Sequence, residues 1–140
     1  MAFERLVQRM LRESGFTQVE VTGRSGDGGI DGSGIVRING LLSFRVLFQC
    51  KRYKGSVGPN EIRDFVGALT GRADRGLFIT TGTFTPKAVR EATRDGIADK
   101  LTIDLIDGNA FAEKLRELHL GVLTRAIEVV DIEETWFKNV

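Results

Sequence analysis

The sequence has few cysteine and histidine residues, which stabilise small folds through disulfides and zinc sites. Its 140 residues include one cysteine, Cys50, and one histidine, His119. An internal disulfide needs two cysteines, and a structural zinc site needs several cysteine or histidine ligands. Neither can therefore form within a single chain, and the fold must depend on a hydrophobic core. A chain of this length is large enough to bury one, so we expect one main domain.

Long apolar runs and a strong excess of charge are also missing. No stretch approaches the roughly 18 consecutive apolar residues that a membrane helix needs, and residues 1–5 lack the basic and then apolar layout of a secretion signal. We therefore expect a cytoplasmic protein with no membrane partner. The net charge is only +1, so affinity for nucleic acid would need a local cluster, of which Lys51-Arg52-Tyr53-Lys54 is the best example.

Hydrophobic spacing predicts helices and strands that alternate along the chain. An amphipathic helix opens the sequence and stops at Ser14-Gly15, and a half-buried strand follows over residues 17–22. Further helices begin after Gly58, Thr85 and Asp107, and the last of these ends just before Gly121. Buried strands are predicted over residues 77–80 and 101–106. This order predicts an α/β fold with a mixed β-sheet flanked by helices on both faces.

The centre of the sequence predicts a β-hairpin. Residues 23–34 include six glycines, and Asn39-Gly40 then separates two β-rich runs. This dipeptide tolerates the positive φ angles of a tight hairpin turn. Along the second strand, Phe48 and Cys50 share one face, while Gln49 and Lys51 share the other.

The side chain of Asp31 tests the register of this hairpin. A regular two-residue turn at Asn39-Gly40 would place Asp31 opposite Phe48, on the apolar face. An acidic side chain belongs on the other face, so we predict either a bulge near Gly32 or Gly34 or a loop longer than two residues. A regular hairpin would contradict the site described next.

Three polar residues near this hairpin can carry chemistry. Gln49 and Lys51 leave the same face of one strand, so their side chains converge. Lys51 offers an ammonium for a phosphate oxygen, and Gln49 offers a neutral oxygen that suits Mg²⁺ or Mn²⁺. The backbone carbonyl of Cys50 can add another oxygen. Such a site needs a carboxylate, for which Asp31 is the nearest candidate and Asp27 the second.

These residues resemble the catalytic domain of Mrr-type restriction endonucleases, which belong to the PD-(D/E)xK nuclease superfamily. The similarity covers roughly residues 1–122 and depends on several segments that occur together in order. The matching segments are Phe3-Glu4, Gly15-Phe16, Gly26-Asp27-Gly28-Gly29-Ile30-Asp31-Gly32, Gln49-Cys50-Lys51-Arg52-Tyr53 and Phe78-Ile79-Thr80-Thr81-Gly82.

The resemblance implies a role for each residue of the site. Asp31 would be the metal-binding aspartate, Lys51 the catalytic lysine and Glu4 an auxiliary acid that also binds metal. Gln49 replaces the more usual acidic ligand of the superfamily, which is typical of the Mrr branch and removes one negative charge. Ile30 stands where the superfamily has proline, which is not a ligand. The implied activity is Mg²⁺- or Mn²⁺-dependent hydrolysis of DNA, with modified DNA as the substrate that the family suggests.

The DNA backbone would be held by basic side chains around this site. Such contacts position the duplex without specifying its sequence. The candidates are Arg52, Lys54, Arg24 and Arg63.

Two other functions fit the same sequence. A nuclease-fold domain could bind branched or modified DNA without cutting it, because Gln49 weakens metal binding. The chemistry could also serve junction resolution or repair. A separate DNA-recognition domain or subunit is a further expected partner, since nothing here resembles an added DNA-binding motif. Cutting both strands needs two sites, which favours a homodimer. Residues 123–140 are expected to pack, to form a dimer contact or to act as a linker.

Overall fold

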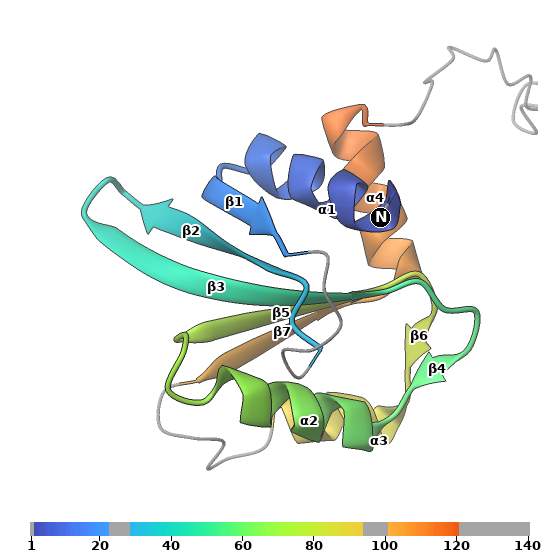
Figure 1. The fold of residues 1–140 in the computed structure, drawn as a ribbon. Coiled ribbons are helices and arrows are strands. Elements are labelled where there is room, and N and C mark those ends of the chain that lie inside the picture. The colour runs from blue at the N-terminus through green and yellow to red at the C-terminus, as the bar shows by residue number, and fades with distance from the viewer. Residues whose placement is uncertain (1, 23–28, 94–100, 121–140) are drawn as a thin grey trace, which may run out of the picture.

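The computed structural model describes residues 2–22, 29–93 and 101–120 (Figure 1). In chain order the elements are α1 (Ala2–Glu13), β1 (Thr17–Val21), β2 (Gly32–Ile38), β3 (Leu42–Lys51), β4 (Ser56–Val57), α2 (Pro59–Leu69), β5 (Arg75–Thr80), β6 (Thr83–Phe84), α3 (Pro86–Thr93), β7 (Thr102–Ile106) and α4 (Gly108–Leu118). None of the helices in these ranges is long and apolar enough to cross a membrane.

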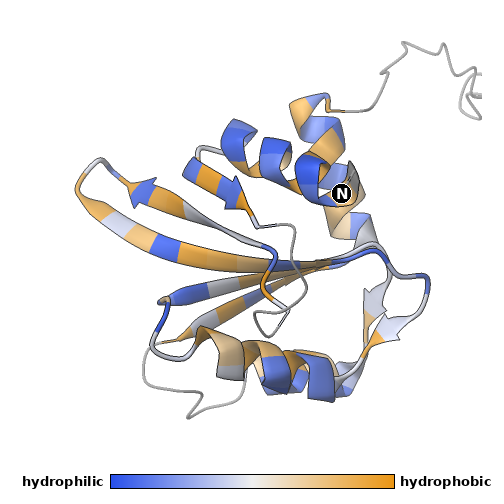
Figure 2. Ribbon diagram, in the orientation of Figure 1, coloured by the Kyte–Doolittle hydropathy of each residue, from blue (hydrophilic) through white to orange (hydrophobic). Residues whose placement is uncertain are grey.

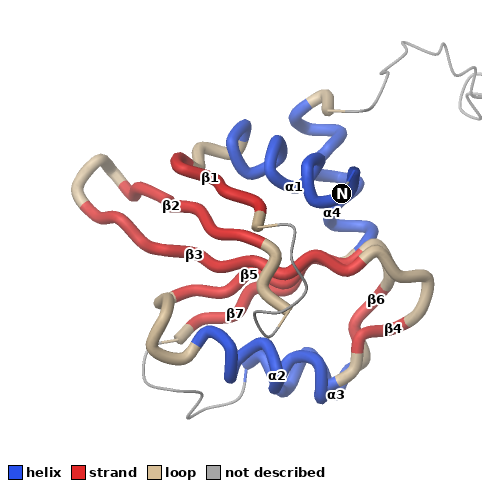
Figure 3. Tube along the Cα trace, viewed as in Figure 1, coloured by secondary structure: helices blue, strands red, loops and turns tan. Residues whose placement is uncertain are grey.

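A five-stranded mixed sheet forms the centre of the fold (Figure 3). Its strand order is β1-β2-β3-β5-β7. The pairs β1–β2 and β2–β3 are antiparallel, whereas the pairs β3–β5 and β5–β7 are parallel. Helices α1 and α4 lie on one face of the sheet, and α2 and α3 lie on the other (Figure 1). The predicted α/β fold with helices on both faces is confirmed.

Two hydrophobic clusters hold the helices against the sheet. Phe48 of β3 packs in the cluster beneath α1 and α4, whereas the adjacent Leu47 packs in the cluster beneath α2 and α3. The alternation predicted for this strand is therefore confirmed, and both of its faces are buried in the sheet centre. In Figure 2, apolar residues are spread along the central strands. The rings of Phe65 and Phe78 meet edge to face at 5.5 Å between centroids, which joins α2 to β5.

The hairpin between β2 and β3 has the register that the site requires. Asn39 and Gly40 both take positive φ, at 55° and 68°, and the Leu41 N–H donates to the Ile38 carbonyl at 3.1 Å. Ile38 nevertheless pairs with Leu42, so Leu41 is an extra loop residue. The three-residue loop shifts the register by one, which is one of the two predicted alternatives. Gly32, instead of Asp31, therefore lies opposite Phe48.

Predicted helix caps are confirmed at two helices. The Ala88 N–H donates to the Thr85 hydroxyl at 3.0 Å at the start of α3, and the Ala110 N–H donates to the Asp107 carboxylate at 2.9 Å at the start of α4. His119 ends α4 in the left-handed conformation, with φ of 56°.

Other details depart from the sequence predictions or lie outside the described residues. The pair β4 and β6, a small parallel sheet, was not predicted because strands of two residues carry no periodicity. Strand β1 is irregular instead of evenly alternating, since Gln18 has φ of 51° and the pairing shifts between Thr17 and Glu20. Arg24, Asp27, Gly121 and the extension 123–140 lie outside the described residues.

Candidate active site

Just before β2 begins, the carboxylate of Asp31 accepts a backbone hydrogen bond from β3, as a carbonyl of a neighbouring strand would. The Asp31 N–H donates to the Phe48 carbonyl at 2.9 Å, and the Thr22 N–H donates to the Asp31 carbonyl at 2.8 Å. These bonds fix the Asp31 backbone between β1 and β3. Its Oδ2 atom then accepts the Cys50 N–H at 2.7 Å. A short bond of this kind, to a charged acceptor, holds the carboxylate against the end of β3.

The same bond indicates where the Cys50 carbonyl faces. In a β-strand the N–H and C=O of one residue point to the same neighbouring strand. The Cys50 N–H points to Asp31, so the Cys50 carbonyl faces the same side, beyond the first residue of β2. The next carbonyl, of Lys51, faces β5 and accepts the Thr81 N–H at 3.1 Å. The Cys50 carbonyl and the Asp31 carboxylate therefore lie at one edge of β3.

Glu4 of α1 lies close enough to Asp31 for the two charges to interact. Burial raises the pKa of Asp31, the hydrogen bond from the Cys50 N–H opposes that rise, and the Glu4 carboxylate adds to it. The pKa of Glu4 itself is lowered, mainly by a hydrogen bond from its own backbone N–H. The Glu4 carboxylate thus lies near Asp31, and its role as an auxiliary acid stays a prediction.

The thiol of Cys50 is unsuited to nucleophilic chemistry. Burial raises its pKa far above that of a free cysteine, and the charges of Asp31 and Glu4 raise it further. A thiol in this environment remains protonated at neutral pH. Cys50 also packs at the border of the cluster beneath α1, which confirms its prediction as a core residue.

Gln49 leaves β3 on the opposite face from Cys50 and meets the loop before β2. A Cβ atom at Gly29 would lie 2.8 Å from the Gln49 Nε2 atom and 2.9 Å from its Oε1 atom, and Gly29 has φ of +87°. The positive φ favours glycine here, and any side chain at this position would also displace the Gln49 amide. Gly29 and Gln49 line a groove beside α2, together with Glu61, Arg63, Asp64 and Gly67.

Lys51 points toward the first turn of α2. Its Nζ atom lies 2.9 Å from Oε2 of Glu61, and both side chains are about one-third exposed, at 34% and 35%. The same ammonium lies 4.7 Å from the centroid of the Tyr53 ring, a cation–π distance. This ion pair was not predicted from the sequence. The position of Glu61 in the first turn of the helix that follows the Lys51 strand was the available clue.

Hydrogen bonds to Thr81 fix the chain that follows Lys51. The Tyr53 N–H donates to the Thr81 hydroxyl at 2.8 Å, and that hydroxyl donates to the Tyr53 carbonyl at 3.1 Å. This anchoring leaves Arg52 and Lys54 exposed at the strand end. Arg63 lines the groove beside Gln49, and its Nε atom lies 3.3 Å from Oε1 of Glu91. Three of the four predicted DNA-contacting residues thus surround the site, and Arg24 lies outside the described residues.

The oxygen atoms at this strand end suit a hard divalent cation. Glu4 and Asp31 supply carboxylates, and Gln49 and the Cys50 carbonyl supply neutral oxygens, which are the ligand types that Mg²⁺ and Mn²⁺ prefer. The mutual repulsion of Glu4 and Asp31 is what a cation between them would relieve. Among residues 2–22, 29–93 and 101–120, however, no three His, Cys, Asp or Glu side chains gather as a metal cluster. The site is therefore poorer in charge than a three-carboxylate centre.

Comparisons with known proteins show what this chain is similar to. The family model Mrr_cat, described as restriction endonuclease, matches residues 1–115. The type IV methyl-directed restriction enzyme EcoKMrr of Escherichia coli K12 is 33% identical over 141 residues, which cover 97% of this chain and 44% of that enzyme. An uncharacterised mitochondrial protein of Schizosaccharomyces pombe is 36% identical over 92 residues, covering 63% of this chain and 37% of its own.

A solved structure has the same fold. The DNA modification-dependent restriction endonuclease AspBHI matches with a TM-score of 0.70 and 22% identity, over 86% of this chain and 32% of that one. The chain spans less than half the length of each curated relative.

Proposed function

The chain belongs to the Mrr-type restriction endonuclease family, and from this premise we propose that it is the catalytic domain of a metal-dependent DNA endonuclease. The observation that carries the proposal is the meeting of Asp31 with the end of β3. Its carboxylate accepts the Cys50 N–H at 2.7 Å, on the strand that also carries Gln49 and Lys51. These are the residues to which the family resemblance assigns the site.

Four groups would hold the metal. They are the carboxylates of Asp31 and Glu4, the amide oxygen of Gln49 and the carbonyl of Cys50. A bound Mg²⁺ or Mn²⁺ supplies Lewis-acid chemistry at a phosphoryl oxygen and makes a coordinated water more acidic. The Cys50 N–H keeps the Asp31 carboxylate in one orientation, and Gly29 keeps room for the Gln49 amide.

Lys51 acts through its positive charge. Hydrolysis of a phosphodiester develops negative charge on the phosphoryl oxygens, and a fixed ammonium stabilises that charge without rearrangement. Glu61 and Tyr53 both hold the Lys51 side chain in place before DNA binds. Glu61 is therefore a positioning residue, and DNA phosphate competes with it for the ammonium.

Flanking phosphates would be held by exposed basic side chains. Arg52 and Lys54 follow the catalytic strand directly, and Arg63 faces the groove beside Gln49. Arg24 is proposed for the same role. Contacts of this kind set the position of the duplex and make binding dependent on salt.

Methylated DNA is the substrate that we propose for the complete protein, since the E. coli relative is named as a methyl-directed enzyme. Recognition of the modification would fall to a separate domain or subunit. A homodimer would supply the second site needed for a double-strand cut. The cytoplasmic location and the role of residues 123–140 stay predictions from the sequence.

The proposal is tested by incubating plasmid and branched DNA with the protein, with and without Mg²⁺ or Mn²⁺. We expect metal-dependent nicking or cleavage that is abolished in Lys51→Ala and Asp31→Ala. Cleavage that survives both substitutions would refute the assignment. Intact DNA binding without any cleavage would favour the rival function, a nuclease-fold module that only binds DNA, for which the neutral Gln49 is the specific observation. Preference for branched over plasmid DNA would favour a junction or repair nuclease.

A further inference from the structure

The outer half of the β2–β3 hairpin has no other strand beside it. Pairing of β1 with β2 ends at Ile35, and pairing of β5 with β3 begins at Val46. Residues 36–45 therefore pair only within the hairpin, and we name them the free ribbon. In Figure 1 this part of the hairpin extends beyond the other strands of the sheet.

One face of the free ribbon continues the face that carries the candidate active site. Arg37 pairs with Ser43, and Arg45 pairs with Ile35. Paired residues share a face, and side chains two apart on a strand do as well. Arg37, Ser43 and Arg45 thus point to the same side of the sheet as Gln49 and Lys51.

All charged side chains of the β2–β3 hairpin are positive. Residues 32–48 include two arginines and no acidic residue, and both Arg37 and Arg45 are exposed. A third arginine, Arg75 at the start of β5, lies 4.6 Å from the centroid of the Phe44 ring. Phe44 and Arg75 lie on the opposite face of the sheet from Arg45, so this third cation is not part of the arginine face of the ribbon.

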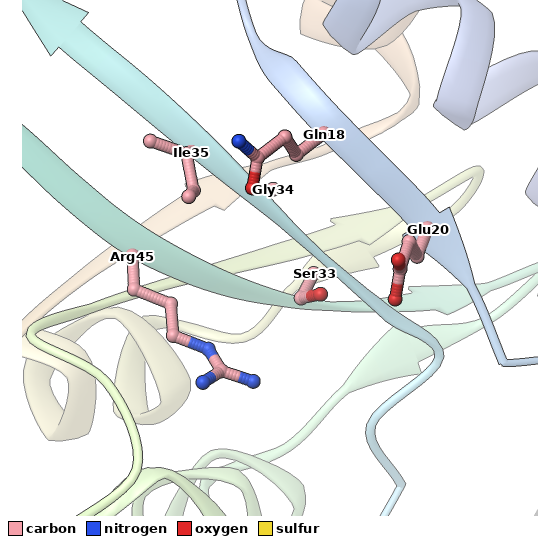
Figure 4. Close-up of a pocket in the computed structure, with 6 residues that line it drawn as sticks. All are labelled: Gln18, Glu20, Ser33, Gly34, Ile35 and Arg45. Carbon is pink, nitrogen blue, oxygen red and sulfur yellow. The ribbon is translucent and has the colours of Figure 1, made fainter.

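A hollow lies at the base of the ribbon, on the same face (Figure 4). Its volume is about 220 Å³. Figure 4 shows the guanidinium of Arg45 reaching away from β3, while Glu20 extends from β1 near Ser33. Glu20 is the one acidic residue among those lining the hollow, which are Gln18, Glu20, Ser33, Gly34, Ile35 and Arg45.

We propose that the free ribbon is a DNA-binding arm, which lies along the same duplex that Lys51 contacts and holds its phosphates through Arg37 and Arg45. This inference rests on the proposed nuclease function. A two-stranded ribbon has a width that the major groove of DNA admits, and arginines on the ribbon face can reach the adjacent backbone. Leu41 and Leu42, exposed at 87% and 59%, occupy the tip and its edge, where they can contact thymine methyl groups.

The rise of a strand gives the spacing of these contacts. Arg45 lies four residues from Gln49 along β3, or about 14 Å at roughly 3.4 Å per residue. Arg37 lies beside Ser43, six residues from Gln49, or about 20 Å away. At about 3.4 Å per base pair these distances place the contacts roughly four and six base pairs from the cleaved bond.

The salt dependence of DNA binding tests the arm. Binding of the full chain to a labelled 30-base-pair duplex is measured in EDTA, so that no cleavage occurs, over a series of KCl concentrations. The slope of log K against log salt changes by about 0.9 for each DNA phosphate that the protein no longer neutralises. We expect the double variant Arg37→Gln/Arg45→Gln to bind at least about tenfold more weakly and to lower the slope by nearly two.

Three further variants make the result specific. Arg5→Gln/Arg9→Gln removes the same charge from exposed positions of α1 and should leave both quantities unchanged. Glu20→Gln should strengthen binding, because it removes the negative charge beside Arg45. Thermal unfolding of each variant shows that the fold is retained, and Leu41→Ser is compared with the unaltered chain in sedimentation.

The outcomes separate this proposal from the proposed function. A chain that cuts DNA, but whose double ribbon variant matches the α1 control in affinity and slope, would overturn the arm and leave the nuclease intact. Dissociation of an oligomer in Leu41→Ser, with unchanged DNA binding in the double variant, would overturn the arm in favour of a protein contact. Failure of the unaltered chain to bind DNA would overturn both proposals.

Discussion

Replacement of Asp31 should separate its structural role from its chemical role. In Asp31→Ala the Cys50 N–H loses its 2.7 Å acceptor, and an unsatisfied buried donor costs about 1–3 kcal/mol. For a domain of this size that corresponds to a fall in Tm of very roughly 4–12 °C. In Asp31→Asn the side-chain oxygen can still accept the bond, and the repulsion from Glu4 is removed. We expect Asp31→Asn to be at least as stable as the unaltered protein at neutral pH and equally inactive.

The pH dependence of stability follows from the raised pKa of Asp31. An acid whose pKa is higher in the folded state binds more protons when folded, so its contribution to stability falls as pH rises through that pKa. This contribution is fully present below the unfolded pKa of about 3.9. The stability advantage of Asp31→Asn should therefore be small near pH 4 and grow toward neutral pH. Asp104→Asn, at an exposed position of β7, is the charge-matched control and should have no such trend.

The assay is thermal unfolding from pH 4 to pH 8, with and without millimolar Mg²⁺. Mg²⁺ should raise the Tm of the unaltered protein and of Asp104→Asn, because a ligand of the folded state stabilises it by mass action. It should not raise the Tm of Asp31→Asn. Equal destabilisation in the alanine and asparagine variants would refute the stabilising role of the Cys50 hydrogen bond. An equal Mg²⁺ effect in all variants would refute Asp31 as a ligand.

Three other substitutions test the remaining parts of the site. Gln49→Glu restores a negative ligand and should lower the Mg²⁺ concentration for half-maximal cleavage by roughly tenfold, or about 1.4 kcal/mol. Metal titration of the cleavage rate measures this concentration, and an unchanged value would exclude Gln49 from the metal site. Glu61→Gln frees the Lys51 ammonium and should change kcat with little effect on DNA affinity, whereas a fall in stability alone would make Glu61 merely structural. Gly29→Ala should reduce cleavage by displacing Gln49. It should also destabilise the fold by about 1–2 kcal/mol because of the positive φ at this position, which denaturant unfolding measures. Full activity would show that the position of Gln49 is unimportant for cleavage.

Local sequence patterns were sufficient to predict most of the fold. The strict alternation of side chains along the second hairpin strand predicted that Phe48 and Gln49 point to opposite faces of the sheet, and both lie on the expected faces. The register near Asp31 could be predicted because side chains alternate with a period of two, so a slip of one residue moves every side chain to the other face. Knowing that Asp31 had to avoid Phe48 was enough to require an irregular loop, although the sequence could not choose between a bulge and an extra loop residue.

Contacts between distant segments could not be predicted in the same way. Lys51 and Glu61 are brought together by the angle at which α2 leaves β4, and no spacing rule specifies that angle. The hydrogen bonds between Thr81 and Tyr53 likewise join segments that follow two neighbouring parallel strands but lie far apart in the sequence. The positive φ of Gln18 has no sequence marker, because glutamine does not favour that conformation.

The most direct test of the metal-dependent active site is the single-turnover rate of DNA cleavage in Mg²⁺, at protein concentrations that saturate the DNA. The unaltered chain should cleave, while Asp31→Asn and Lys51→Ala should each be slower by at least about a thousandfold, or roughly 4 kcal/mol of transition-state stabilisation. Both variants should retain their DNA affinity within a few fold. Cleavage at the unaltered rate by either variant, or cleavage that persists in EDTA, would contradict the assignment of Asp31 and Lys51 to the active site.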